Sequence, residues 1–319
     1  MSDHDVLIIG QGAAAFSAAI YAARYQLKTI VVGETFGGET ATGGMIENYP
    51  GYADIDGFEL MMKFREQVDK YEVPVVDDKI VSLSGEGHCF TATAGSGDRY
   101  LTPTIIMAVG RERRTLGLDH EWDWVGRGVS YCSTCDAPLH RGNTVAVVGG
   151  GNAAVEGAVL LSKYAEKVYL IYRQERFTRP EPVNLRSLDE AANVTSVLGT
   201  RVLELKGDDG LSGVVLDTEV AGSKELALDG IFIEIGADPR VDLASSLGAA
   251  LNEQNEVIVD KNMRTSVHGM FAAGDVTDAS GDLKQTITAA AQGAIAATSA
   301  YADLAEHPNS CQWHARSVA

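Results

Sequence analysis

The chain has 319 residues, of which 45% are hydrophobic and 22% are charged, a composition typical of a globular protein long enough for two cores. Its net charge of −18 argues against nucleic acids and anionic membranes as partners. The N-terminus has no basic segment, and its apolar run at 6–9 is too short for a signal peptide or a membrane span. We therefore expect a cytoplasmic protein, because four cysteines do not make a secreted disulfide framework at this length.

The N-terminal segment predicts a βαβ unit. Residues 6–9 are typical of a buried strand, an alanine-rich helix follows, and 29–32 form a second strand. The turn between the first strand and the helix has the pattern G-x-G-x-x-A at Gly10, Gly12 and Ala15. Glycines at such a turn allow the backbone to approach a pyrophosphate, and the N-terminus of the helix supplies N–H donors.

The same pattern returns in the middle of the chain. A strand at 145–148 leads into a second G-x-G-x-x-A turn at Gly149, Gly151 and Ala154, and a helix and a strand at 168–171 follow. One such turn is weak evidence, but two in the full strand–turn–helix–strand context indicate two dinucleotide sites or a duplicated fold. The sequence therefore predicts an α/β protein with two Rossmann-like nucleotide-binding domains.

Further elements lie between and after the two units. Residues 57–71 predict an amphipathic helix that packs on the core, and 104–110 a strand that runs into a glycine. Near the end of the chain, a strand leads into Gly274 and Asp275, and an alanine-rich helix follows from about 285 to 304.

A close cysteine pair, Cys132 and Cys135, stands just upstream of the second turn. Such a pair suits a redox disulfide, because attack by one thiolate is resolved through the other. It is also half of a zinc site, but structural zinc needs four ligands and the sequence has no second close pair. We expect a redox disulfide and no metal, with Cys89 and Cys311 as passive thiols.

The order and spacing of these motifs resemble the low-molecular-weight flavoprotein thioredoxin reductases over almost the full length. The motifs that carry the resemblance are the two glycine turns, Glu47-Asn48-Tyr49-Pro50-Gly51, the segment 131–136, Ala273-Gly274-Asp275 and Lys284-Gln285-Thr286-Ile287. The resemblance implies a homodimer whose FAD-binding domain comprises 1–118 and 242–319. An inserted NAD(P)-type domain at 119–241 would carry the redox pair and rotate about hinges near 118–125 and 237–242.

The resemblance also implies how FAD binds. The first glycine turn would hold the pyrophosphate, Gly274 and Asp275 the ribityl chain, and Asn48 and Gln285 the isoalloxazine. Glu34 suits the adenosine ribose, since an acidic side chain about 20 residues beyond the glycines bonds the 2′-OH. Taken alone, Asp275 is as typical of a helix N-cap or a turn as it is of a flavin site, and its Ala-Gly-Asp context is what favours flavin.

In such enzymes the cysteines have different roles. Cys135 would face the flavin and take electrons from it, and Cys132 would attack the disulfide of thioredoxin or a thioredoxin-like protein. Asp136 would act as general acid and base for the exchange. A helix that begins at the motif would favour the thiolate. His140 is expected to be a surface or core histidine.

The electron donor is where the sequence departs from the family pattern. After the second unit, relatives have His-Arg-Arg-x-x-x-Arg to grip the 2′-phosphate of NADPH, whereas this chain has Tyr172-Arg173-Gln174-Glu175-Arg176-Phe177-Thr178-Arg179. Only Arg173 matches, because Gln174 and Thr178 replace arginines. We expect NADPH to be a poor donor, with ferredoxin or another donor in its place. In some relatives without NADPH, a C-terminal aromatic residue covers the flavin, and Trp313 is the candidate here; the alternative is a disordered tail in which this tryptophan has no such role.

Two other functions stay open from the sequence. The first is a dithiol oxidase, which would pass electrons from a small dithiol through flavin to oxygen and needs no pyridine nucleotide. The second is a redox sensor that binds a dinucleotide and signals without turnover. Formation of hydrogen peroxide in air would favour the oxidase, and absence of turnover with every donor would favour the sensor.

Overall fold

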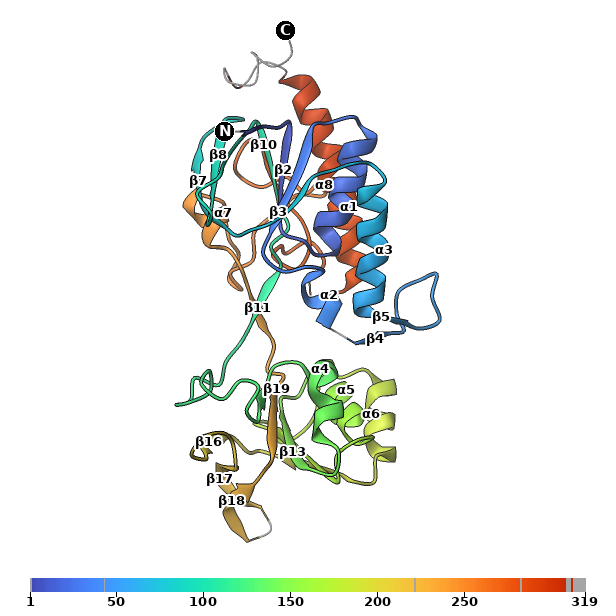
Figure 1. Cartoon of the computed structure of the whole chain (residues 1–319), viewed down its shortest axis with the longest axis vertical. Coiled ribbons are helices and arrows are strands. Elements are labelled where there is room, and N and C mark those ends of the chain that lie inside the picture. Colours follow the sequence, from blue (N-terminus) through green and yellow to red (C-terminus); the bar gives the residue numbers. More distant parts are fainter. Residues whose placement is uncertain (1, 43, 221, 282, 308–310, 312–319) are drawn as a thin grey trace. The chain divides into compact units, whose positions relative to one another are not determined.

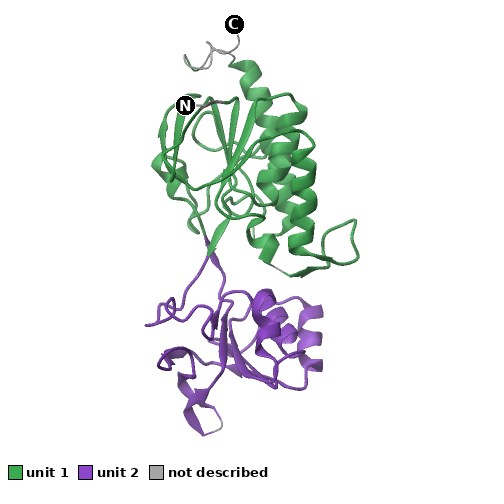
Figure 2. Cartoon of the chain, viewed as in Figure 1, with its two compact units in different colours: residues 1–112, 239–319 green, residues 113–238 purple. Residues whose placement is uncertain are grey.

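The computed structural model describes residues 2–42, 44–220, 222–281, 283–307 and 311, and it divides the chain into two compact units (Figure 2). Unit 1 comprises residues 1–112 and 239–319, and unit 2 comprises residues 113–238. The segment that the sequence predicts to be inserted is therefore a unit of its own, built from one continuous stretch of chain.

The unit boundaries differ from those expected after residues 118 and 241. The structure places them after residues 112 and 238. The reason is packing, because Leu116 and Leu118 lie against the buried core of unit 2 around Trp124.

A five-stranded parallel sheet forms the centre of unit 1. Its strand order is β21-β10-β2-β3-β6. The strands are β2 (Val6–Ile9), β3 (Thr29–Gly33), β6 (Val75–Asp77), β10 (Thr104–Met107) and β21 (Met270–Ala272). Strands β2, β3 and β10 are buried at every position, as a parallel sheet with both faces covered requires.

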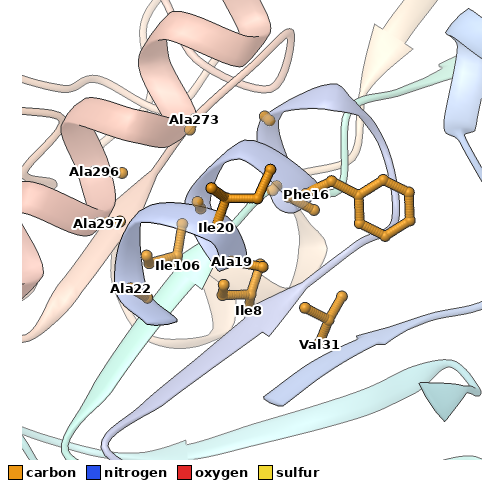
Figure 3. Packing of buried hydrophobic residues seen from close by; sticks show 14 of the residues in the cluster. Ile8, Phe16, Ala19, Ile20, Ala22, Val31, Ile106, Ala273, Ala296 and Ala297 are labelled. Atoms are coloured by element: carbon orange, nitrogen blue, oxygen red, sulfur yellow. The ribbon is translucent and has the colours of Figure 1, made fainter. Parts of the chain in front are cut away.

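Three helices cover one face of this sheet (Figure 1). They are α1 (Ala13–Arg24), α3 (Gly57–Asp69) and α8 (Thr286–Glu306). Figure 3 shows Ile8 and Ile106 of the sheet close to Phe16 and Ile20 of α1. Helix α8 crosses α1 closely, because a Cβ on Gly293 would lie 2.0 Å from the carbonyl oxygen of Ala14.

A smaller sheet and several short elements complete unit 1. The smaller sheet has the order β1-β9-β8-β7. Its strands are β1 (Ser2–Asp3), β7 (Ile80–Gly85), β8 (Phe90–Ala94) and β9 (Arg99–Thr102). The short elements are α2 (Gly38–Thr42), β4 (Met45–Ile46), β5 (Ile55–Asp56) and α7 (Asp242–Ser246).

Unit 2 repeats the parallel architecture. Its main sheet has the order β12-β19-β13-β14-β15, all parallel. The strands are β12 (Val129–Ser130), β13 (Thr144–Val148), β14 (Lys167–Tyr172), β15 (Val194–Leu198) and β19 (Gly230–Ile233). The helices are α4 (Ser133–Asp136), the 3-10 turn η1 (Ala137–His140), α5 (Asn152–Leu161) and α6 (Pro182–Glu190).

An antiparallel layer of three strands completes unit 2. It consists of β16 (Val202–Lys206), β17 (Gly213–Val220) and β18 (Ser223–Ala227). One buried cluster of unit 2 includes Val202 and Val214 from this layer together with Ile231 of the main sheet, and a second includes Val155 of α5 and Leu188 of α6. The main sheet is therefore covered on both sides.

Two chain crossings connect the units. They pair as a two-stranded ribbon of β11 (Arg111–Arg113) and β20 (Ala237–Pro239). Within the described residues, no helix combines the length and the apolar character needed to cross a membrane.

Candidate functional site

The two glycines of the first turn have different surroundings, because Gly10 is tightly packed and Gly12 is open. Gly10 has φ +120°, and a Cβ there would lie 2.2 Å from the carbonyl oxygen of Ala108. Gly12 caps α1, and a Cβ there would meet no atom within 4 Å. Ala15 is fully buried in α1, so its side chain packs the helix onto the sheet and does not face the open side. The open backbone at Gly12 is where a pyrophosphate would fit.

Gly274 and Asp275 follow β21 and meet this turn from the other end of the chain. Gly274 has φ +82°, and its N–H donates to Gln292 Oε1 at 2.7 Å. Arg111 Nε donates to the backbone oxygen of Asp275 at 3.1 Å. Burial raises the pKa of the Asp275 carboxyl above its ordinary value, against the opposing charges of Lys284 and Arg111.

A charged cluster that sequence reasoning missed lies around Glu256. Its carboxylate accepts from Arg111 Nη2 at 2.6 Å and from Asn252 Nδ2 at 2.8 Å, and lies 2.9 Å from Lys284 Nζ. Burial alone would raise the pKa of Glu256, but the hydrogen bonds of Asn252 and Lys284 outweigh it and lower that pKa. Lys284 stands in a motif already quoted, whereas nothing in a single sequence singles out Glu256.

The structure brings together the two residues predicted to lie by the isoalloxazine. Asn48 Nδ2 donates to Gln285 Oε1 at 3.0 Å, across 237 positions of sequence. Gln285 is also the N-cap of α8, in a capping box with Thr288. The start of α8 is thereby fixed beside the loop that carries Asn48.

Glu34 lies directly after β3, where a ribose-binding carboxylate is expected. It is not isolated, because Lys79 Nζ and Arg240 Nη1 each lie 3.4 Å from Glu34 Oε1. Gln11, which sequence reasoning missed, joins the first glycine turn to the ends of β3 and β6. Its Nε2 donates to the Asp77 carboxylate at 2.7 Å and to the carbonyl oxygen of Gly33 at 2.7 Å.

The predicted redox pair is a disulfide in the structure, between Cys132 and Cys135, with 5.3 Å between their Cα atoms. Cys132 is the N-cap of α4, and the N–H of Cys135 donates to Cys132 Sγ at 3.1 Å. Cys135 is exposed and Cys132 half-buried. An N–H aimed at Cys132 Sγ would stabilise a thiolate on that sulfur after reduction.

Two carboxylates hold the redox segment, and sequence reasoning missed both. Ser133 Oγ donates to Glu234 Oε1 at 2.9 Å. Tyr131 OH donates to Glu121 Oε1 at 2.5 Å, and Glu121 is only 2% exposed. Burial, followed by this hydrogen bond, raises the pKa of Tyr131 far above its ordinary value, so the hydroxyl stays a donor. The residues on both sides of Cys132 are thus anchored.

Asp136 ends α4, and its charge faces His140. Burial lowers the pKa of His140, although Asp136 and Asp229 act to raise it. The His140 ring packs edge-on against Phe232, with 5.2 Å between ring centroids. His140 is therefore a packing residue, and Asp136 is the carboxylate closest in sequence to the disulfide.

An aromatic side chain packs against the buried side of the second glycine turn. Gly149 has φ +151°, and Gly151 caps α5, where an added Cβ would meet no atom within 4 Å. At Gly150, however, a Cβ would lie 2.2 Å from the ring of Tyr172. That ring stacks on Phe177 with 5.6 Å between centroids and 5° between planes.

Acidic and amide groups crowd the N-terminus of α5, where a second pyrophosphate would bind. Asn152 Oδ1 accepts from the backbone N–H of Glu181 at 2.7 Å, and Asn152 Nδ2 donates to Glu181 Oε1 at 3.3 Å. Arg173, Arg176 and Arg179 lie in the segment after β14, and all three are exposed. The second turn is as open at Gly151 as the first is at Gly12, and it differs from the first by the Asn152–Glu181 pair at the start of its helix.

The prediction of passive thiols at Cys89 and Cys311 is wrong. The two cysteines form a disulfide with 4.9 Å between their Cα atoms. Sequence reasoning missed it because 222 positions separate them and only the fold brings them together. Trp313, the predicted cover of the flavin, lies outside the described residues.

Among the described residues, one group has the composition of a metal site. Ligand atoms of His88, Asp303 and His307 lie within 4.8 Å of one another. The Asp303 carboxylate already lies 2.5 Å from His88 Nε2 and 3.6 Å from Arg264 Nη1. The cluster is charge-balanced without an ion, and we assign no metal to it.

Comparisons with known proteins agree with this arrangement. The family described as "Pyridine nucleotide-disulphide oxidoreductase" matches residues 4–293. The thioredoxin reductase of Treponema pallidum (strain Nichols) is 36% identical over 302 residues, which are 94% of this chain and 96% of that protein. The chain belongs to the low-molecular-weight thioredoxin reductase family.

Solved structures extend the family relationship. The thioredoxin reductase of Lactococcus lactis superposes with a TM-score of 0.88 at 34% identity, over 95% of this chain and 99% of that one. A ferredoxin-flavin thioredoxin reductase from Clostridium acetobutylicum gives a TM-score of 0.51 at 29% identity, over 95% and 99%. The predicted fold class is confirmed, and the protein is an oxidoreductase like the other thioredoxin reductases.

Proposed function

We propose that this protein is an FAD-dependent disulfide oxidoreductase that reduces thioredoxin or a thioredoxin-like protein through Cys132 and Cys135. The observation that carries the proposal is the disulfide at the start of α4, with Cys135 exposed and an N–H directed at Cys132 Sγ. The relatives named above are thioredoxin reductases, which supports the same substrate class.

The residues of unit 1 fit FAD. The space at Gly12 admits a phosphate against the N-terminus of α1, and the Asp275 carboxylate is available as an acceptor for a hydroxyl. Asn48 and Gln285, bonded to each other, supply amide groups for a ring system. When bound, FAD would supply the two electrons that reduce the Cys132–Cys135 disulfide.

The cysteines then carry out the exchange. The Cys132 thiolate attacks one sulfur of the substrate disulfide, and a mixed disulfide forms as the substrate's own bond breaks. The other substrate sulfur leaves as a thiolate and takes up a proton, for which Asp136 is the nearby carrier. Cys135 then attacks Cys132 Sγ, which re-forms the internal disulfide and releases the second substrate thiol.

NADPH is proposed to be a poor donor, with ferredoxin or another reductant in its place. The support comes from unit 2, where the Glu181 carboxylate lies near the start of α5. A carboxylate repels a pyrophosphate, and Gln174 and Thr178 lack the charge that would hold a 2′-phosphate.

We also propose that the protein is a homodimer. Helix α3 exposes the large apolar side chains of Phe58 and Met62, and Ile295 and Tyr301 of α8 are exposed as well. A second copy of the chain that covered these side chains would remove their apolar surface from water. Sedimentation velocity at two concentrations tests this assignment.

An anaerobic titration of the purified protein tests the function and its donor. Reduced ferredoxin should bleach the flavin absorbance in stoichiometric amounts, NADPH and NADH should do so slowly, and oxidised thioredoxin should restore the colour. A colourless protein that takes up no FAD would contradict the proposal. If small dithiols bleach the flavin, air restores it with hydrogen peroxide, and thioredoxin has no effect, the protein is a dithiol oxidase instead.

A further inference from the structure

The second disulfide joins two distant parts of unit 1. Cys89 directly precedes β8, and Cys311 follows the end of α8. The Cys311 side chain is 4% exposed, whereas Cys89 is half-buried. Neither cysteine belongs to the redox pair or to the glycine turns, so the proposed function gives this bond no role.

The same two chain segments are also joined by polar contacts. His88 Nε2 lies 2.5 Å from Asp303 Oδ2, and Arg264 Nη1 lies 3.6 Å from Asp303 Oδ1. The rings of His88 and His307 stack with 4.7 Å between their centroids. Asp303 and His88 are 5% and 6% exposed, so the contact between them is shielded from water, whereas the side chains of Arg264 and His307 are 39% and 46% exposed. The segment before β8 and the C-terminal end of α8 are therefore joined twice, once by the disulfide and once by these polar and ring contacts, which form the His88–Asp303 network.

We propose that Cys89–Cys311 is a second thiol–disulfide exchange site, at which a dithiol opens a covalent clasp between the turn before β8 and the end of α8. Because the His88–Asp303 network holds the same two segments, breaking the Cys89–Cys311 disulfide makes these segments more mobile without unfolding unit 1. The dithiol formed by the proposed function belongs to the substrate class of the site, and to that extent the inference rests on that function.

The chemistry balances with the dithiol as the only reductant. Its thiolate attacks Cys89 Sγ, because Cys89 is the more exposed residue of the pair, and the Cys89–Cys311 bond breaks. Cys311 leaves as a thiolate and takes up one proton. The second thiol of the reductant attacks the mixed disulfide and releases Cys89, which takes up the other proton. The reductant is oxidised by two electrons to a disulfide, and the protein disulfide is reduced by the same two electrons.

The test uses the full-length FAD-loaded protein with Cys132→Ser and Cys135→Ser, in which the first redox pair is silent. The protein is incubated without denaturant with reduced thioredoxin or with dithiothreitol, then alkylated and analysed by peptide mass spectrometry. We expect Cys89 and Cys311 to become alkylated together. Hydrogen exchange at 86–89 and 303–307 should then accelerate about tenfold or more, while the central sheet stays protected.

The controls separate a clasp from a merely structural bond. A Cys89→Ser, Cys311→Ser variant should show the faster exchange without any dithiol; if it fails to fold, the reduced parent protein provides the same measurement. Adding His88→Asn should accelerate hydrogen exchange further, since it removes the hydrogen bond to Asp303 that still joins the two segments. A bond that is reduced only in denaturant, or a reduced protein with unchanged exchange, would overturn the inference. Because the first pair is absent, neither result depends on thioredoxin reductase activity.

Discussion

The two cysteines of the redox pair differ in their surroundings, although only two residues separate them. Cys132 Sγ receives an N–H, and the residues beside it are held by Glu121 and Glu234, whereas Cys135 is exposed. A thiolate is thus favoured on Cys132, which supports its assignment as the exchange thiol.

Replacing either cysteine should abolish thioredoxin reduction, but with different trapped species. In Cys135→Ser, Cys132 attacks thioredoxin and nothing resolves the product, so a stable mixed disulfide should accumulate. In Cys132→Ser, no such adduct should form. Non-reducing gel electrophoresis and intact mass measurement distinguish the two. An adduct seen only in Cys132→Ser would reverse the assigned roles.

Asp275 is proposed to bind the flavin, and its buried carboxyl makes the stability of the apoprotein depend on pH. Since burial raises its pKa in the folded state, ionisation costs the apoprotein stability as pH rises above about 3.9, the ordinary value, through the raised value. Asp275→Asn should therefore leave the apoprotein at least as stable at pH 7 by thermal unfolding. The same change should weaken FAD binding by about 1.5–3 kcal/mol, because a charged acceptor is lost. Unchanged FAD affinity in a titration would remove Asp275 from the site.

Among the elements, the first glycine turn leads directly into α1, and the two glycines of this turn serve different purposes. Gly10 is required by the fold, because its φ is +120° and a side chain would collide with the backbone at Ala108. Gly12 is not required by the fold, because the space beside it is empty of protein atoms.

Alanine substitutions at these positions are a matched pair. Gly10→Ala should destabilise the folded protein by about 2 kcal/mol or more, from strain and the backbone collision. Gly12→Ala should fold with near-normal stability but bind FAD poorly, because its methyl group occupies the phosphate space. Urea unfolding of the apoproteins and flavin content after reconstitution are the measurements. Normal flavin content in Gly12→Ala would place the pyrophosphate elsewhere.

The segment after β14 is proposed to decide whether the protein uses pyridine nucleotide. Tyr172→His, Gln174→Arg and Thr178→Arg together restore the family's His-Arg-Arg-x-x-x-Arg run. We expect NADPH affinity to rise roughly tenfold to a hundredfold, the effect of one or two charge-assisted contacts. Ser223→Arg together with Ala227→Arg, both at exposed positions of the same unit, is the control for the two added charges. Equal gains from the control would show a nonspecific effect.

At the scale of the whole molecule, each unit has its own buried core. The two clusters of unit 2 consist of residues between 116 and 235, and the two clusters of unit 1 contain none of these. Unit 1 is built from both ends of the chain, which α1 and α8 join by close packing.

Residues 113–238 alone should therefore fold cooperatively. We expect the excised segment to give a sigmoidal thermal transition by circular dichroism, to form the Cys132–Cys135 disulfide and to bind no FAD. A control segment that starts at residue 119 lacks Leu116 and Leu118 and should be less stable, since both pack on the unit 2 core. A noncooperative transition in the longer segment would contradict independent folding.

Much of the fold could be predicted from local sequence patterns. Apolar runs bounded by glycine turns determined the two βαβ units, because a parallel strand buried on both faces must be apolar throughout. The helix expected at 57–71 is observed as Gly57–Asp69, where Asp56 caps its first turn. The redox pair was equally evident, because its two cysteines are close in sequence.

Contacts between distant segments were decided only by the tertiary structure. The Cys89–Cys311 bond, the Glu256 cluster and the Tyr172 ring against Gly150 each join positions that no periodicity relates. The boundary of unit 2 likewise depends on where 116–118 pack and not on where the repeat begins. The physical reason is that local patterns report the backbone geometry of one segment, whereas pairing and charge balance depend on which segments the fold brings into contact.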